Sequence, residues 1–380
     1  MNTKQRATAA FEKVETELQQ ISRWLYENPE TAYQEVEASA RLARFLEERG
    51  FTVSHPAHGL DTSFEATVGS SGPRVVICAE YDALPQVGHA CGHNIIATSS
   101  LGAGAALADV AEELGIRVSV LGTPAEEGGG GKIELIGAGA FEDAAAAMMI
   151  HPSPHDLADP RLLAAQGFTA TFRGRTAHAA ATPHMGINAL DAFVSAYNGV
   201  SALRQQFEPG DRVHGVIAEG GAAPNVIPDL TVSQWIVRAQ TSERFDVLRE
   251  KVVACFEAAA LATGCGLDIE YGWKPYIDLV TNETMVDLFR ANAAALGREV
   301  PTYAATGIET SASSDMGNVS HVVPSIHPSL RIETDAVNHQ PEFAAATITS
   351  SGEGALRDGA LAMAHTIIDM AEQDVWDRLG

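Results

Sequence analysis

The sequence is poor in basic residues, aromatic residues, cysteine and long apolar runs. It has 25 Lys+Arg against 49 Asp+Glu in 380 residues, a formal net charge of −24. Binding to a phosphate backbone or to an anionic membrane surface needs clustered basic side chains, so this balance argues against a nucleic-acid or membrane partner. We find no run of about 18 apolar residues that could span a bilayer, and the polar N-terminal segment does not have the form of a signal peptide.

The four cysteines, Cys78, Cys91, Cys255 and Cys265, are too few for a disulfide framework in a chain of this length. Together with the charge and the polar start, this predicts a cytoplasmic protein. At roughly 100–200 residues per domain, the length predicts two domains.

The pattern of the first 164 residues predicts parallel strands alternating with helices. Short apolar runs at 74–78, 117–121 and 146–150 are expected strands, residues 94–114 have helical spacing, and the first 20 residues form an amphipathic helical pattern. Functional sites of such sheets lie beyond the carboxyl ends of the strands.

The pattern changes between about 165 and 275. Alternating strands are predicted at 167–173, 213–219, 230–238 and 267–271, with helices at 188–206 and 242–263. The helix and strand alternation of the first part returns after 275. The sequence therefore predicts an α/β domain made of 1–164 and 276–380, with a mostly parallel sheet flanked by helices, and a smaller α+β domain at 165–275 inserted into it.

Polar residues with metal-binding chemistry follow three of the predicted strands. Cys91 and His93 flank a glycine in GHACGHN, the pair Glu126 and Glu127 lies in TPAEEGGGG, and His151 follows the strand that ends at residue 150. Thiolate, imidazole and carboxylate together suit two divalent ions bridged by a water or hydroxide. One glutamate can face a metal while the other exchanges a proton with water and a leaving amine.

Other residues are weaker candidates on the sequence alone. His327 and His339 are each as compatible with a surface position as with a ligand role, and Cys91 with His93 could instead form the nucleophile and base of a cysteine amidase. A non-catalytic binding or scaffold protein is the third alternative.

The ordered motifs EYDALP, GHACGHN, TPAEEGGGG, MIHP, TAHAA, GGAAPNVIP, SSDMGN and NHQPEF resemble the dinuclear metallopeptidase family of aminoacylases, glutamate carboxypeptidases and auxin-conjugate hydrolases. Its amidohydrolase branch, including aminobenzoyl-glutamate hydrolases, is the most similar. The resemblance covers nearly the whole chain. It implies a metal-dependent hydrolase that cleaves an amide bond of a small N-acyl amino acid, dipeptide or aryl-amido amino acid, with two ions of zinc, manganese or cobalt.

The resemblance also assigns roles to residues. It implies that Cys91, His93, Glu127, His151 and His339 bind the metals, that Glu126 is the general base, and that Asp82 orients a metal ligand. Glu80 is expected beside Asp82, and Glu80 and Asn94 occupy positions where many members of the branch carry Asp. His327 is the rival of His339 as last ligand.

The inserted domain resembles the lid and dimerisation domain of the family. It implies a homodimer in which His178 reaches the partner's site and polarises the scissile carbonyl. Asn225, Arg238, Asp315 and His327 are expected to contact substrate or to line its pocket.

Overall fold

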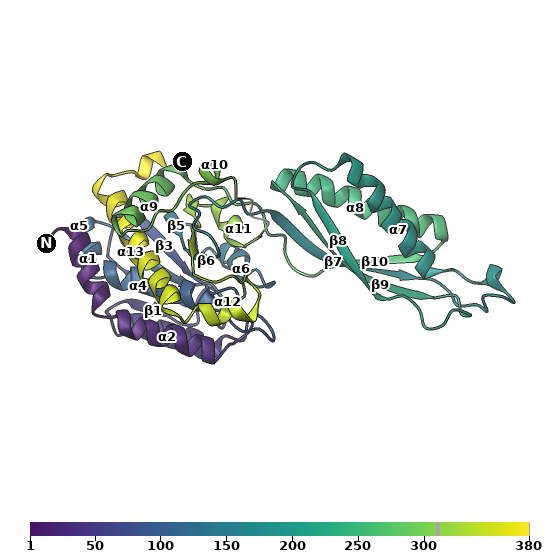
Figure 1. Ribbon diagram of the computed structural model, residues 1–380, viewed down its shortest axis with the longest axis horizontal. Helices are drawn as coiled ribbons and strands as arrows, with labels where there is room; N and C mark the ends of the chain where they lie inside the picture. The colour runs from purple at the N-terminus through teal and green to yellow at the C-terminus, as the bar shows by residue number, and fades with distance from the viewer. Residues whose placement is uncertain (309–311, 380) are drawn as a thin grey trace. The chain divides into compact units, whose positions relative to one another are not determined.

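A computed structural model describes residues 1–308 and 312–379 (Figure 1). The chain divides into two compact units. The first contains Met1–Arg161 with residues 279–308 and 315–379, and the second contains Leu162–Asp278 with residues 312–314. The second unit interrupts the first in sequence, so it is an insertion. Among the described residues, no helix is long and apolar enough to cross a membrane. The cytoplasmic location stays a prediction.

The first unit is built on a six-stranded sheet in the order β1-β2-β4-β3-β5-β11. Its strands are β1 (Thr52–Ser54), β2 (Glu65–Val68), β3 (Arg74–Ala79), β4 (Arg117–Gly122), β5 (Ala144–Met148) and β11 (Ser325–Ile326). The pairs from β4 through β3 and β5 to β11 are parallel, and β1 and β2 add an antiparallel edge. The predicted α/β class with a mostly parallel sheet is confirmed.

Helices cover both faces of this sheet. They are α1 (Thr3–Glu12), α2 (Glu15–Glu27), α3 (Val36–Glu47), α4 (His93–Leu107), α5 (Ala111–Leu114), α6 (Gly131–Gly137), α9 (Glu283–Ala295), α10 (Tyr303–Thr306), α11 (Met316–Ser320), α12 (Pro341–Ala346), α13 (Ser350–Glu372) and the 3₁₀ turn η3 (Trp376–Arg378). In β3, Val75 and Ile77 belong to the core that contains residues of α1–α4, α9 and α13, whereas Val76 and Cys78 belong to the core beneath α6 and α11. Every side chain of β3 is buried, as expected for a central parallel strand.

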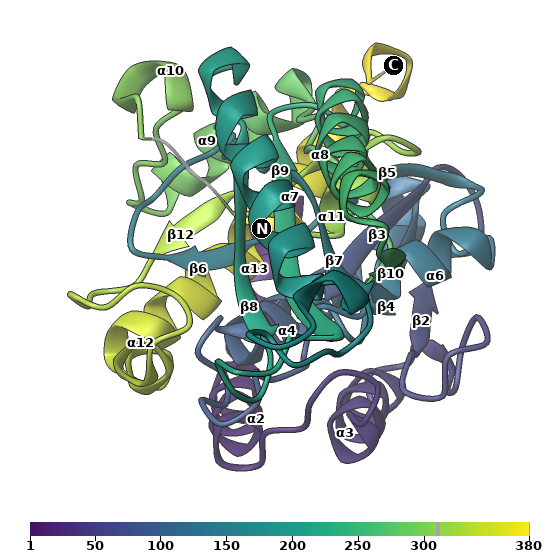
Figure 2. The same cartoon turned by 90° about the vertical axis from the view of Figure 1, so that its right-hand side faces the viewer.

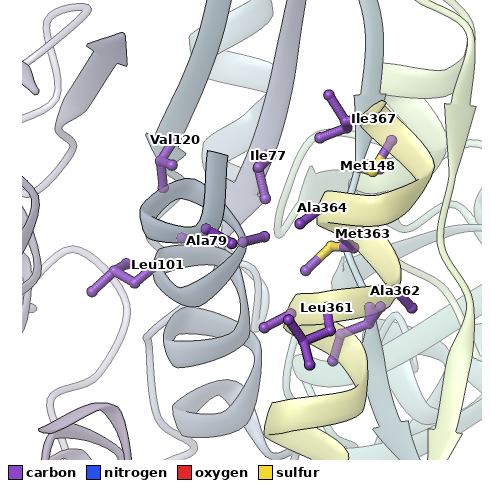
Figure 3. Packing of buried hydrophobic residues seen from close by; sticks show 14 of the residues in the cluster. Ile77, Ala79, Leu101, Val120, Met148, Leu361, Ala362, Met363, Ala364 and Ile367 are labelled. Atoms are coloured by element: carbon purple, nitrogen blue, oxygen red, sulfur yellow. The ribbon is translucent and has the colours of Figure 1, made fainter. Parts of the chain in front are cut away.

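Helices α4 and α13 form the centre of the larger core. Figure 3 shows side chains of the sheet, among them Ile77, Val120 and Met148, next to these two helices. All residues of α4 are buried, which explains its uniform run of small and apolar residues. The α4 helix fixes the position of the residues at its own start, where two of the predicted metal ligands lie.

The second unit contains a four-stranded antiparallel sheet in the order β10-β7-β9-β8. The strands are β7 (Ala164–Arg173), β8 (Arg212–Glu219), β9 (Leu230–Ala239) and β10 (Gly266–Tyr271); the helices are α7 (Ala189–Leu203) and α8 (Ser242–Thr263), with 3₁₀ turns η1 (Pro183–Met185) and η2 (Arg204–Gln206). Helices α7 and α8 pack side by side on one face of the sheet (Figures 1 and 2). Phe168, Trp235 and Phe256 are buried in this core.

Some predicted boundaries are wrong. The helical pattern of the first 20 residues is broken between α1 and α2, and the helix predicted at 94–114 is two helices, because residues 108–110 turn before α5. The strand predicted to end at Ile150 ends at Met148. A second short strand, β6 (His151–Ser153), then begins and pairs in parallel with β12 (Ser329–Arg331), so His151 lies opposite Ser329.

Candidate metal centre

The start of α4 holds Cys91 and His93 on either side of a glycine that no other residue could replace. Gly92 has a φ of 83°, in the left-handed region, and a Cβ added to it would lie 2.3 Å from Cγ of Pro152. The tight turn therefore aligns the thiol and the imidazole against the segment that follows β5. Cys91 Sγ lies 3.5 Å from His151 Nε2.

A carboxylate orients His93. Asp82 Oδ1 lies 2.9 Å from Nδ1 of the His93 ring, and Asp82 Oδ2 accepts a hydrogen bond from the backbone N–H of Glu127 at 2.9 Å. A carboxylate on one imidazole nitrogen leaves the other nitrogen to face a metal, which is the usual arrangement around metal-binding histidines. Asp82 thus connects the two motifs in the way the sequence predicts.

The loop after β4 brings Glu126 and Glu127 to the same place. Ala125 has a φ of 59°, and its N–H donates to the buried carboxylate of Glu35 at 2.9 Å. This backbone turn lets the two glutamates point differently. Glu126 Oε2 and Glu127 Oε1 both lie 3.9 Å from His93 Nε2, and His339 Nε2 lies 3.5 Å from Glu127 Oε1.

These side chains form groups whose ligand atoms all lie within 4.8 Å of one another. One group is Cys91, His93 and His151. A second is Cys91, Glu127 and His339, so the thiol of Cys91 is common to both. A third is Glu80, His93 and Glu126. All five residues predicted as ligands are therefore brought together.

The buried polar atoms fit a cation. Within the described chain, Glu80 Oε2, His93 Nε2 and Glu127 Oε1 are buried and have no hydrogen-bond partner. Orphaned buried polar atoms are costly unless something pairs with them, and these three point into one small region. Sulfur, nitrogen and oxygen donors in this number suit zinc-like divalent ions.

The pKa shifts indicate an excess of negative charge at the centre. Burial and the neighbouring carboxylates Glu80 and Glu127 raise the pKa of Glu126 well above its usual value. Burial would lower the pKa of His93, but Asp82 raises it far above the ordinary range. Burial also raises the pKa of the Cys91 thiol. In the absence of a metal, then, Cys91 is a protonated thiol, which disfavours the cysteine-amidase alternative.

His327 and His339 occupy different environments. The ring of His339 is 57% exposed on its side chain, and its backbone N–H donates to the carbonyl of Ala90 at 2.8 Å. His327 is buried, its centroid lies 5.4 Å from that of His151, and neither ring nitrogen has a hydrogen-bond partner within the described chain. Only His339 of the two belongs to one of the three groups of the described residues.

The sequence does not predict the buried triad that lies beside the centre. The ammonium of Lys132 lies 2.5 Å from Glu80 Oε1 and 2.6 Å from Asp315 Oδ1, and all three side chains are fully buried. Asp315 is expected from the sequence to line a substrate pocket; in the structure it is bonded to Lys132 instead. Lys132 directly follows the glycine turn, and a lone lysine there carries no signal without knowledge of its distant partners.

The remaining predicted residues belong to the second unit. His178 is exposed, and its Nδ1 accepts hydrogen bonds from the N–H groups of Ala180 and Ala181 at 3.2 Å. Asn225 lies beside it, because its carbonyl accepts from the N–H of Ala179 at 3.0 Å. Arg238 donates to Ser313 Oγ at 2.8 Å, so it has a protein partner in this structure.

Comparison with known proteins identifies the family. Residues 164–264 match the M20 peptidase dimerisation domain. The chain is 42% identical to the mouse Xaa-Arg dipeptidase and 37% identical to the human one, in each case over 97% of this chain and 88% of the relative. This chain belongs to the M20 peptidase family.

Further M20 relatives support the assignment. A p-aminobenzoyl-glutamate hydrolase polypeptide of Escherichia coli is 32% identical over 64% of this chain and 55% of its own length. A dinuclear metal-binding M20 peptidase from Bacillus subtilis has the same fold, with a TM-score of 0.73 and 22% identity over 95% of this chain and 99% of its own. The predicted resemblance is confirmed, and the chain is a hydrolase of C–N bonds in small amide substrates. The scaffold alternative is wrong.

Proposed function

We propose that this M20 hydrolase is a dipeptidase that uses two divalent metal ions held by groups sharing Cys91. One ion would be bound by Cys91, His93 and His151, and the other by Cys91, Glu127 and His339. The observation that carries the proposal is the shared thiol, since three ligand atoms within 4.8 Å on each side of one sulfur match two adjacent ions. Zinc, manganese and cobalt are the candidate metals.

Bound ions of this kind polarise a carbonyl oxygen and lower the pKa of water towards neutrality. The protein's own residues have complementary tasks. Glu126, buried beside His93, accepts the proton of the attacking water and returns it to the departing amine. Its raised pKa favours this exchange, because a carboxylate with a pKa nearer to neutrality both takes and gives a proton at working pH. Asp82 holds the ring of His93 in one orientation.

His178 is the proposed donor to the substrate carbonyl. Because its Nδ1 accepts two backbone hydrogen bonds, the neutral ring carries its proton on Nε2. That N–H can stabilise the negative charge that develops on the carbonyl oxygen. Asn225 and Arg238 remain proposed substrate contacts of the same unit, and Asp315 and His327 remain proposed elements of the pocket.

A homodimer through the second unit accounts for a surface that this unit leaves exposed. Strand β8 is an edge strand, with Val216 62% and Ile217 45% exposed, and α7 exposes Val194 and Tyr197. An apolar edge strand favours pairing with another chain, and the match to a dimerisation domain covers this region. We propose that a second copy pairs here.

The dipeptide class rests on the two relatives that match the chain over most of its length. The test is a panel of dipeptides, with C-terminal arginine included, set against N-acyl amino acids and p-aminobenzoyl-glutamate. Metal-free protein should be inactive and regain activity with zinc, manganese or cobalt. Release of amino acids only from the acylated or aryl-amido compounds would contradict the dipeptidase assignment, and full activity after complete metal removal would contradict the metal assignment.

A further inference from the structure

Glu80 has two carboxylate oxygens in different situations. Oε1 is bonded to the ammonium of Lys132 at 2.5 Å. Oε2 is fully buried, has no hydrogen-bond partner within the described chain, and lies 3.4 Å from the ligand nitrogen Nε2 of His93. A carboxylate with one oxygen tied down and the other orphaned beside an imidazole nitrogen is arranged like one that binds a cation.

The 3.4 Å separation has a chemical meaning. Two ligand atoms on one tetrahedral ion, each with a bond of about 2.0–2.3 Å, lie roughly 3.3–3.7 Å apart. Cys91 Sγ and His151 Nε2 are separated by 3.5 Å, as are Glu127 Oε1 and His339 Nε2. Glu80 and His93 meet the same spacing, whereas Glu126 is further from His93, at 3.9 Å.

The position of Glu80 is fixed by two partners. Lys132 is itself held twice by Asp315, which accepts from its Nζ at 2.6 Å and from its backbone N–H at 2.9 Å. The residue before it, Gly131, packs so closely that an added Cβ would lie 1.8 Å from the carbonyl oxygen of Pro124. The start of α6 therefore cannot move without moving the loop that carries Glu126.

The charges of this triad do not balance. One ammonium faces two carboxylates, and all three groups are buried. A buried charge without compensation is strongly destabilising, so one more positive charge is needed near Glu80. A divalent ion at His93 would supply it.

We propose that Glu80 is an additional oxygen ligand of the ion bound by His93, and that Lys132 and Asp315 are positioning residues that hold its free oxygen towards that ion. The inference rests on the proposed dinuclear centre and extends it from five ligand residues to six. His93 Nε2 is the common point, because it belongs both to the group with Cys91 and to the group with Glu80.

The test measures metal binding rather than turnover. Metal-free full-length protein is titrated with Co²⁺, whose visible absorption reports coordination number, and each dissociation constant is obtained by competition with a chelator. Wild type should bind two ions. Glu80→Gln should weaken one site by at least about 10–100-fold, the range seen when a supporting partner of a ligand is lost, and should change the spectrum of that site alone.

Lys132→Met should weaken the same site by about 10–100-fold. In the double variant Glu80→Gln/Lys132→Met the site should be no weaker than in Glu80→Gln alone, because Lys132 acts through Glu80. Matched controls are Lys251→Met and Glu372→Gln, exposed residues that should leave both constants unchanged.

A lysine removed from between two buried carboxylates can prevent folding. The triple variant Glu80→Gln/Lys132→Met/Asp315→Asn removes all three charges at similar volume, and it should keep one tight ion and one weak one. Two wild-type-like constants in Glu80→Gln or in the triple variant would overturn the ligand role. Additive weakening in the double variant would overturn the positioning role. Fewer than two ions in the wild type would contradict the dinuclear centre itself.

Discussion

The candidate residues of the two units differ in how their polar atoms are satisfied. In the first unit, Glu80, His93 and Glu127 present buried atoms that have no hydrogen-bond partner within the described chain. In the second unit, His178 and Asn225 are exposed and engaged by backbone groups of their own loops. The first set is incomplete without a cation, whereas the second is stable as it stands and is available to a substrate. The difference separates residues that build a metal centre from residues that meet a ligand.

The largest effect is expected at Glu126. Glu126→Gln keeps the size and removes the proton acceptor, so kcat should fall by about 10²–10⁴-fold while both ions stay bound. Steady-state kinetics and metal analysis of the same preparation check this, with Glu372→Gln as the control. Near-normal turnover would remove Glu126 from the chemistry, and loss of an ion would make it a ligand.

His178→Ala sharpens the contrast between the units. Removing a donor to the developing oxyanion should lower kcat by about 10²–10³-fold without changing the metal content, because His178 lies in the unit that holds none of the proposed ligands. The measurement pairs kcat with metal stoichiometry. A loss of metal in this variant would break the distinction drawn above.

The two C-terminal histidines provide the next comparison. His339→Ala should release the ion of the Cys91–Glu127 group or weaken it by at least about 10–100-fold, whereas His327→Ala should retain two ions. Chelator competition measures both. The reverse result would make His327 the last ligand and would favour the alternative that the sequence leaves open.

The sequence predicts the parts of the centre that depend on strand order. Cys91, Glu126 and His151 each follow a strand of one parallel sheet, and strands of that kind end at one edge. It does not predict the Lys132–Asp315 pair, because 183 residues separate the partners and neither residue type indicates burial. Local helix breaks, such as the turn at 108–110, escape prediction because the apolar pattern continues through them.

The metal-free protein should lose stability as the pH falls. Burial, aided by neighbouring charge, lowers the pKa of His327 to about 4 and that of His151 to about 3. Because the unfolded state takes up these protons near pH 6.5 and the folded state does not, stability should decrease from about pH 6.5 down to about pH 4, by about 1.4 kcal/mol per pH unit for each group. Denaturant unfolding at several pH values checks this, and His327→Gln should flatten the dependence. An equal slope in that variant would refute the contribution of His327.

The smallest effect is expected on the surface of the second unit. Arg173 and Asp268 form an ion pair at 2.9 Å with both side chains more than half exposed. Arg173→Ala should change the free energy of unfolding by less than about 1 kcal/mol and leave kcat and metal content unchanged. Thermal and denaturant unfolding measure the first quantity, and a larger loss would show that this pair supports the sheet.

The shared thiol of Cys91 is tested most directly by counting metal ions. Equilibrium dialysis followed by elemental analysis should find two divalent ions per chain in the wild type. Cys91→Ala removes the one side chain common to both groups and should weaken both sites together, whereas His151→Ala and His339→Ala should each weaken one. Two tightly held ions in Cys91→Ala, or the loss of only one, would contradict the dinuclear centre described above.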